Sequence, residues 1–194
     1  FVPGRATQAL VAAVQRQGVQ VVGVETYASA EEARAAARRL NGRSFDAVLL
    51  ADGGRVAMQI GPAVKSGPRI LGTELWAGGP NLGQSARLGG SWYAAPSDAR
   101  WGQFVQRYQA RYGRQPVRIA TLGYDSVLLT VRAARNWPVG RRFPEAVLRE
   151  AEGFAGVDGI FRFDRSNVAQ RAFEVRSVTA GGTTVVSPAP SSFN

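Results

Sequence analysis

Cysteine and histidine are both absent from the 194-residue chain. Without thiolates and imidazoles, the sequence lacks the usual protein ligands of zinc, haem and copper. Ser-His-Asp and Cys-His catalysis are impossible within this chain, and a disulfide scaffold is excluded, although an oxidising compartment is not. The composition therefore predicts no metal site, no cofactor and no enzymatic activity.

Lysine is nearly absent too, since Lys65 is the only one among 24 basic residues. The net charge of +10 nevertheless raises the question of a nucleic-acid partner. The arginines are scattered, with Arg38-Arg39 and Arg141-Arg142 as the only adjacent pairs, whereas phosphate-binding proteins usually concentrate charge on one helix or tail. Because alanine, glycine and valine are also abundant, GC-rich codon usage explains the arginines, and we expect no nucleic-acid partner. A nucleic-acid-associated module stays open as an alternative on the charge alone.

Long apolar runs are missing as well, so the sequence predicts no transmembrane helix. Hydrophobic residues make up 45% of the chain and charged residues 20%, which is typical of a globular domain. The chain opens with Phe1-Val2-Pro3-Gly4, without an initiating methionine or a charged leader region. Phe1-Val2 resembles the end of a β-strand that enters a turn before a helix, and we expect the chain to begin inside a larger protein.

The first 95 residues alternate between short apolar runs and helical patterns. Predicted strands cover residues 19–24, 45–50 and 69–72, and predicted helices cover 7–17, 29–41 and 53–64. Ser29 and Glu32 form a capping box at the second helix. Strands joined by helices at this spacing predict a doubly wound α/β lobe with a parallel sheet.

The pattern changes after Gly78. A strand over residues 88–94 precedes three predicted helices, over about 97–112, 118–134 and 144–151, and strands follow at 160–163, 173–178 and 183–186. Three amphipathic helices without strands between them suggest that the chain leaves one lobe near Ala95-Pro96 and returns near Val157–Gly159. We expect residues 1–95 and 158–194 to form one lobe, and residues 96–157 to contribute to another whose remainder is missing.

Five segments, in order along nearly the whole chain, carry a resemblance to a known family: residues 70–76, 88–96, 104–116, 123–126 and 154–164. Together they resemble the second half of type I periplasmic binding proteins, the leucine/isoleucine/valine-binding receptors of ABC transporters. The resemblance implies a two-lobe fold with a hinge that closes on a small polar solute, an amino acid among the candidates. The implied partners are the missing amino-terminal half of the same protein and an ABC permease.

Within that family the sequence looks closest to a lipoprotein branch labelled penicillin-binding protein activators. That likeness gives an alternative function, in which the same fold regulates peptidoglycan synthases by binding a penicillin-binding protein. Either function implies the periplasm, or a lipoprotein anchored in the outer membrane. Occupancy of the cleft between the lobes separates the two.

Solutes bind at the carboxyl ends of parallel strands in folds of this kind. The residues to test there are Arg5, Asp52, Glu74 and Trp76. Glu74 resembles the family's acidic residue that pairs with a ligand ammonium group, and Arg5 at a helix start suits a carboxylate. The alternatives are a helix cap for Asp52, a lid over the core for Trp76 and an exposed loop carboxylate for Glu74.

One further candidate, Tyr124, belongs to a helix that we expect in the other lobe. Its neighbour Asp125 is interpreted as a cap, because a carboxylate is favourable near the start of a helix. Leu49, Leu50 and Ala51 stand where many transport members of the family have aromatic and small polar residues, which departs from the amino-acid-binding pattern.

Overall fold

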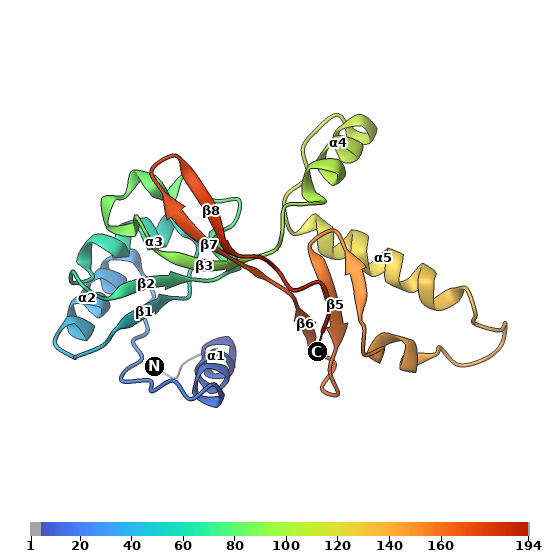
Figure 1. Ribbon diagram of the computed structural model, residues 1–194, viewed down its shortest axis with the longest axis horizontal. Coiled ribbons are helices and arrows are strands. Elements are labelled where there is room, and N and C mark those ends of the chain that lie inside the picture. The colour runs from blue at the N-terminus through green and yellow to red at the C-terminus, as the bar shows by residue number, and fades with distance from the viewer. Residues whose placement is uncertain (1–4, 194) are drawn as a thin grey trace. The chain divides into compact units, whose positions relative to one another are not determined.

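The structure is a computed structural model that describes residues 5–193, in two compact units. Unit 1 contains the residues up to Ala94 together with Arg176–Thr184, and unit 2 contains Ala95–Val175 and the residues from Val185 onward. Figure 1 shows the elements of each unit. Unit 1 contains helices α1 (Arg5–Arg16), α2 (Ala30–Asn41) and α3 (Gly54–Ile60) and strands β1 (Ala47–Leu50) and β2 (Arg69–Gly72). Strands β3 (Trp92–Ala95), β7 (Glu174–Thr179) and β8 (Gly182–Ser187) begin or end in unit 1 and cross its boundary with unit 2. Helices α4 (Trp101–Tyr112) and α5 (Ala120–Ala134) with β4 (Phe154–Gly156), β5 (Gly159–Phe163) and β6 (Ala169–Arg171) build unit 2.

The main sheet has the strand order β1-β2-β3-β7-β8. Strands β1 and β2 are parallel, with Val48 opposite Ile70 and Leu50 opposite Gly72, and β2 is parallel to β3. This confirms the predicted α/β fold with a parallel sheet. Since parallel strands point the same way, the residues that follow β1 and β2 emerge at the same end of the sheet.

The helices of unit 1 pack through small side chains. Ala33, Ala36 and Ala37 of α2 are buried, as are Ala57 and Ile60 of α3. The predicted cap of α2 forms on its Ser29 side, where Ser29 Oγ accepts from the Glu32 amide at 3.2 Å. The Glu32 carboxylate accepts from the amide of Ala28, one residue before the N-cap, at 2.8 Å. Alanine faces of this kind let helix backbones approach closely, which explains how α2 and α3 share a core without large side chains.

One predicted strand of unit 1 does not form. Residues 19–24 were expected to be a buried strand, but they lie in no helix or strand, and Val19, Val22 and Val24 are 53%, 40% and 44% exposed. Valine-rich composition favours a strand only where a neighbouring edge supplies hydrogen bonds. No strand of the described residues pairs with this segment, and the prediction is therefore wrong here.

Two other elements differ from their predictions in extent. Strand β3 begins only at Trp92, because residues Ala86–Leu88 form a 3₁₀ turn ahead of it. The third helix is a single 3₁₀ segment, Glu145–Arg149. That turn suffices to place Val147 and Leu148 against the cluster of Leu129, Phe154 and Phe161, and the chain then leaves for β4.

Unit 2 is built on a small antiparallel sheet of order β4-β5-β6, against which α5 packs. Helix α5 buries every fourth residue, Thr121, Asp125, Leu129 and Ala133. The first change of unit comes after Ala94, but the return comes after Val175 rather than near residue 158. The chain stays in unit 2 beyond residue 158 because β5 pairs with both β4 and β6, which keeps this three-stranded sheet together beside α5. Among residues 5–193, no helix is long and apolar enough to span a membrane.

Candidate functional site

The carboxyl ends of β1 and β2 meet through a hydrogen bond between Trp76 and Asp52. The indole Nε1 of Trp76 donates to the Asp52 carbonyl at 3.0 Å. Trp76 is only 2% exposed, and its ring lies against Gly72, where a Cβ would come within 2.3 Å of it. The ring also contacts Tyr93, at 5.8 Å between centroids. Trp76 is thus buried at the carboxyl end of β2, and its ring offers almost no surface on which a solute could stack.

The Asp52 carboxylate is engaged within unit 1. Its Oδ1 accepts from the Gly53 amide at 2.6 Å, and its Oδ2 accepts from the Tyr27 hydroxyl at 3.1 Å. Burial, and then the negative charge and hydrogen bond of Asp52, raise the pKa of Tyr27 to about 12. Tyr27 therefore stays a donor over the whole physiological range. Sequence reasoning missed Tyr27, although an aromatic residue placed directly after a valine-rich run was the available signal.

Glu74 lies at the same end of the sheet as Asp52. It is the first residue of a 3₁₀ turn, Glu74–Trp76, whose start is capped by the Thr73 hydroxyl accepting from the Leu75 amide at 3.4 Å. The Glu74 side chain is exposed, and its carboxylate has no partner among the described residues. It is thus a solvated carboxylate next to the strand ends. Of Arg5, the structure describes only that α1 begins there, and its side chain lies outside the described part.

A cavity of about 330 Å³ opens beside Trp76 within unit 1. Its walls are the loop of residues 78–82, the turn of residues 181–183, and the side chains of Trp76, Tyr93 and Arg176. The size is at the lower limit of small-molecule sites. Neither Asp52 nor Glu74 lines it, so Trp76 is the one predicted site residue with a described side chain that borders this cavity.

Tyr124, the candidate on the other unit, is 40% exposed on α5 and packs edge-on against Phe104, at 5.2 Å between ring centroids. Its neighbour Asp125 is not a helix cap. Helix α5 begins at Ala120, so Asp125 lies beyond the first turn, 2% exposed. Asp125 Oδ1 instead accepts from the Val157 amide at 2.9 Å, which fixes the turn between β4 and β5.

Burial raises the pKa of the Asp125 carboxyl, and the negative charge of Asp158 adds to this rise, although the hydrogen bond from Val157 and the charge of Arg171 oppose it. Its Oδ2 has no hydrogen-bond partner among the described residues. Gly156 passes so close that a Cβ there would lie 2.2 Å from Oδ2. The side chain thus acts as a buried support for the hairpin.

The neighbouring carboxylate, Asp158, is held by α5 and by the segment before it. Arg118 Nη2 contacts Asp158 Oδ1 at 2.8 Å, and Thr121 Oγ1 donates to Asp158 Oδ2. Arg118 also contacts Asp98 at 2.5 Å. Arg118 thereby links three segments of unit 2 through charge-assisted hydrogen bonds. Because both carboxylate oxygens of Asp158 are held by these contacts, Asp158 has a structural role in unit 2.

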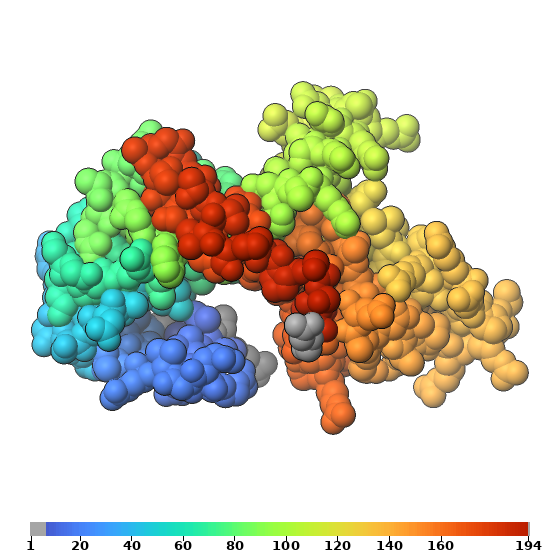
Figure 2. Space-filling model, viewed as in Figure 1, coloured from blue at the N-terminus to red at the C-terminus, as the bar shows by residue number. Residues whose placement is uncertain are grey.

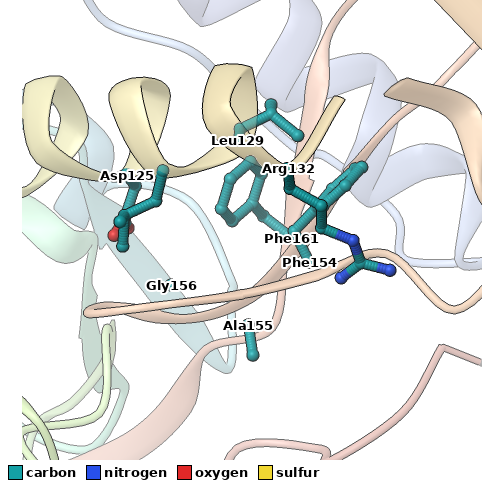
Figure 3. A pocket seen from close by; sticks show the side chains of 8 residues that line it. Asp125, Leu129, Arg132, Phe154, Ala155, Gly156 and Phe161 are labelled. Atoms are coloured by element: carbon teal, nitrogen blue, oxygen red, sulfur yellow. The ribbon is translucent and has the colours of Figure 1, made fainter. Parts of the chain in front are cut away.

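A cavity of about 90 Å³ lies between α5 and β4 (Figure 3). Asp125 and Arg132 project from the helix toward the strand that carries Ala155 and Gly156. The cavity is well below the 300–1,000 Å³ of typical ligand pockets, and it has room for a few water molecules only. Among the described residues, no group of acidic side chains could hold a metal ion.

The parallel strands, their helical crossover and the change of unit after Ala94 define an α/β lobe. Residues 3–183 match the family described as periplasmic binding protein, and the chain belongs to this family. The comparison with curated proteins gives no match.

Solved structures share the fold. A putative branched-chain amino acid ABC transporter from Rhodospirillum rubrum aligns with a TM-score of 0.68 and 23% identity, over 93% of this chain and 56% of that one. A solute-binding protein from R. palustris in complex with benzoate aligns with a TM-score of 0.61 and 18% identity, over 94% of this chain and 55% of that one. The substrate-binding protein LivJ from Streptococcus pneumoniae, in complex with isoleucine, aligns with a TM-score of 0.53 and 22% identity, over 92% of this chain and 56% of that one. The chain thus spans about half the length of these proteins.

Proposed function

We propose that the chain is part of a non-enzymatic receptor that delivers a small solute to an ABC transporter, in the periplasm or outside the cell. The observation that carries this proposal is the exposed Glu74 carboxylate, which has no partner among the described residues and follows β2 at the end of the sheet where Asp52 follows β1. This is the place where open α/β sheets bind ligands. Membership of the periplasmic binding protein family supports the same role.

The solute is proposed to carry an ammonium group, which a solvated carboxylate recognises by charge and hydrogen bonding. The related structures name isoleucine for one protein and benzoate for another, so the ligand class varies within this fold. Glu74 favours the ammonium-bearing class. Arg5, Asp52 and Tyr124 are proposed as further contacts, with Arg5 suited to a solute carboxylate. Trp76 would then act indirectly, by fixing the Asp52 backbone from below.

We also propose that the whole protein has a second lobe to which unit 2 belongs. Tyr124, Val127, Leu128 and Val131 stand at i, i+3, i+4 and i+7 on α5 and are 40%, 62%, 47% and 52% exposed. Figure 2 shows α5 (yellow) at the surface of unit 2. An apolar stripe of this spacing is typical of a helix face that packs on another element. The proposed cover is the amino-terminal half of the same protein, because the chain spans about half of each related structure.

The experiment is calorimetric titration of the full-length protein with the common amino acids and with benzoate. We expect heat from at least one amino acid. Glu74→Gln should weaken that binding by roughly 10- to 100-fold, which is the ~1.5–3 kcal/mol of a charge-assisted hydrogen bond. Glu31→Gln is the matched control, because Glu31 is an exposed carboxylate in the first turn of α2. It should leave the affinity unchanged.

Two results contradict the proposal. Equal weakening by both substitutions would show a general charge effect rather than a contact at Glu74. Absence of heat and of ligand-induced stabilisation across the whole panel would reject the receptor function. A pull-down with a penicillin-binding protein then becomes the next measurement, since the lipoprotein-regulator alternative needs no solute.

A further inference from the structure

The cavity beside Trp76 is lined by neither carboxylate of the proposed function, Asp52 or Glu74. All of its lining residues belong to unit 1, and its volume is about 330 Å³. Among the described residues that line it, Arg176 is the only charged one, and no carboxylate is present. A ligand in this cavity therefore meets positive charge, and anions are favoured over cations there.

Arg176 reaches the cavity from β7, a strand in which buried and half-buried residues alternate. It lies on the buried face, and only 9% of its surface is exposed. Water screens a charge in such a wall less than a charge on the surface, so its attraction for an anion is stronger. Glu174 lies two residues earlier on the same buried face but does not line the cavity. Arg176 is thus the one charged side chain that a ligand in the cavity can contact.

Four lining side chains are aromatic or aliphatic: Trp76, Pro80, Leu82 and Tyr93. Trp76 and Tyr93 lie side by side, with 5.8 Å between their ring centroids, and are 2% and 4% exposed. The indole N–H of Trp76 is already bonded to the Asp52 carbonyl. These side chains close the cavity with carbon atoms, which suits the apolar body of a small ligand.

The loop of residues 78–82 forms one wall, and the fold holds this loop on two sides. A Cβ at Gly83, the next residue, would lie 2.0 Å from the Thr179 carbonyl oxygen of β7. A Cβ at Gly54, the first residue of α3, would lie 3.1 Å from Leu82. Packing this close fixes the wall before any ligand is present, so binding costs little ordering of the loop.

The turn of residues 181–183 forms the opposite wall. The Val178 amide donates to the Ser91 carbonyl at 2.9 Å, just before β3 begins. The turn that follows Val178 therefore lies toward the amino end of β3, whereas Asp52 and Glu74 follow the carboxyl ends of β1 and β2. This wall is thus at the other end of the sheet from the proposed solute contacts.

We propose that this cavity binds a second small solute, a monocarboxylate with an apolar or aromatic body. One guanidinium balances one negative charge, and its planar fork matches a carboxylate through two parallel hydrogen bonds. A phosphate group brings further charge, for which the described lining residues offer no second cation. The aromatic and aliphatic side chains then contact the body of the solute.

Calorimetric titration of the full-length protein with phenylacetate tests the ligand class. Phenylacetamide is the uncharged match, and inorganic phosphate is the competing anion. We expect saturable binding of phenylacetate, and at least ~10-fold weaker binding of phenylacetamide because it lacks the charge. Phosphate should bind more weakly than phenylacetate. Absence of saturable phenylacetate binding, equal binding of the amide, or tighter binding of phosphate would overturn the proposal.

Two substitutions on β8 test the location of the site. Thr183 lines the cavity, whereas Thr184 is also exposed but does not line it. Thr183→Trp should weaken phenylacetate binding by at least roughly 10-fold because the indole fills the cavity, and Thr184→Trp should leave the binding unchanged. Glu74→Gln should leave it unchanged too, so the result is independent of the receptor function. Equal loss in both tryptophan variants, no loss in Thr183→Trp, or loss in Glu74→Gln would overturn the proposal.

Arg176→Gln tests the role of the charge. It should abolish the preference for phenylacetate over phenylacetamide, and a preference that persists would reject Arg176 as the anion contact. Because Arg176 is buried, the melting temperature of this variant is measured first. Thr183→Trp changes an exposed position and decides the proposal if Arg176→Gln does not fold.

Discussion

The Tyr27 hydroxyl donates to Asp52 Oδ2 at 3.1 Å, although the two residues are 25 positions apart. The contact joins the segment that precedes α2 to the carboxyl end of β1. It orients the Asp52 carboxylate, which also accepts a hydrogen bond from the Gly53 amide at the turn into α3. Glu74, at the end of β2, has no such support and remains solvated. The strand ends thus present one carboxylate held by two hydrogen bonds, Asp52, and one that is exposed to solvent, Glu74.

Replacing Tyr27 tests the first half of this arrangement. Tyr27→Phe should lower the free energy of unfolding of the full-length protein by about 1 kcal/mol, because a net hydrogen bond is lost while the ring remains. Urea denaturation at pH 7 measures it. Tyr112→Phe is the control, since Tyr112 is 62% exposed and should change stability little. An equal effect of both substitutions would show that the hydrogen bond from Tyr27 to Asp52 adds no stability of its own.

The same substitution gives a pH signature. Tyr27 has a pKa of about 12 in the folded protein and 10.0 as its ordinary value. Between these values the unfolded chain releases the proton and the folded one keeps it, so ionisation favours unfolding and stability falls as pH rises from about 10 to 12. Tyr27→Phe should remove that part of the slope. Denaturation curves at pH 9 and 11.5, for wild type and variant, measure the difference, and parallel slopes would contradict the raised pKa.

Asp125 predicts an asymmetry between two substitutions. Asp125→Ala should destabilise the full-length protein by about 1–3 kcal/mol, because the buried Val157 amide loses its acceptor. Asp125→Asn keeps an acceptor and removes a buried charge, so it should cost less at pH 7. Since burial raises the pKa of Asp125, wild-type stability should fall relative to Asp125→Asn as pH rises from 4 to 7. Urea denaturation at both pH values measures the difference in stability between wild type and Asp125→Asn. The same difference at pH 4 and pH 7 would show that ionisation of Asp125 costs no stability.

The close approach of Gly156 to Asp125 gives a steric prediction. Gly156→Ala would place a Cβ 2.2 Å from Oδ2 and 3.0 Å from Oδ1, so the melting temperature should fall by several degrees as the hairpin shifts. Gly102→Ala in α4 meets nothing within 4 Å and should raise the free energy of unfolding by up to about 1 kcal/mol through helix propensity. Calorimetric scans of the full-length protein compare them. Stabilisation by Gly156→Ala would mean that the Asp125 side chain can move away from the new methyl group without loss of stability.

On α5, we expect a charge in the apolar stripe of Tyr124, Val127, Leu128 and Val131 to reduce stability more than a charge at an exposed position beside the stripe. In the full-length protein, Val131→Asp should destabilise by roughly 2 kcal/mol or more if the stripe is covered, since a charge would be buried without a partner. Thr130→Asp lies off the stripe, on an exposed part of the same helix, and should change stability by less than about 0.5 kcal/mol. Equal, small effects of both would show that the stripe faces solvent in the whole protein.

The sequence by itself determined the strand–helix–strand unit of β1, α3 and β2, the parallel pairing of β1 with β2, the capped start of α2 and the hairpin of β7 and β8. These features rest on local signals, such as apolar runs bounded by glycine, a Ser-x-x-Glu cap and a Gly-Gly turn. Asp52 and Glu74 were placed at one end of the sheet by the same reasoning, because parallel strands share an end. The exclusion of zinc and disulfide chemistry needed composition alone.

Only the tertiary structure decided which partner each of these elements has. Residues 19–24 have the composition of a strand and do not form one, because strand formation depends on an edge that no local signal encodes. Asp125 was predicted to be a cap but lies on the buried face of α5, where it accepts a hydrogen bond from the Val157 amide, 32 residues away in the sequence. Trp76 has the position of a ligand platform but packs on Gly72 and donates to Asp52. Hydrogen bonds and burial between distant residues form only when the chain is folded, so periodicity and spacing cannot specify them.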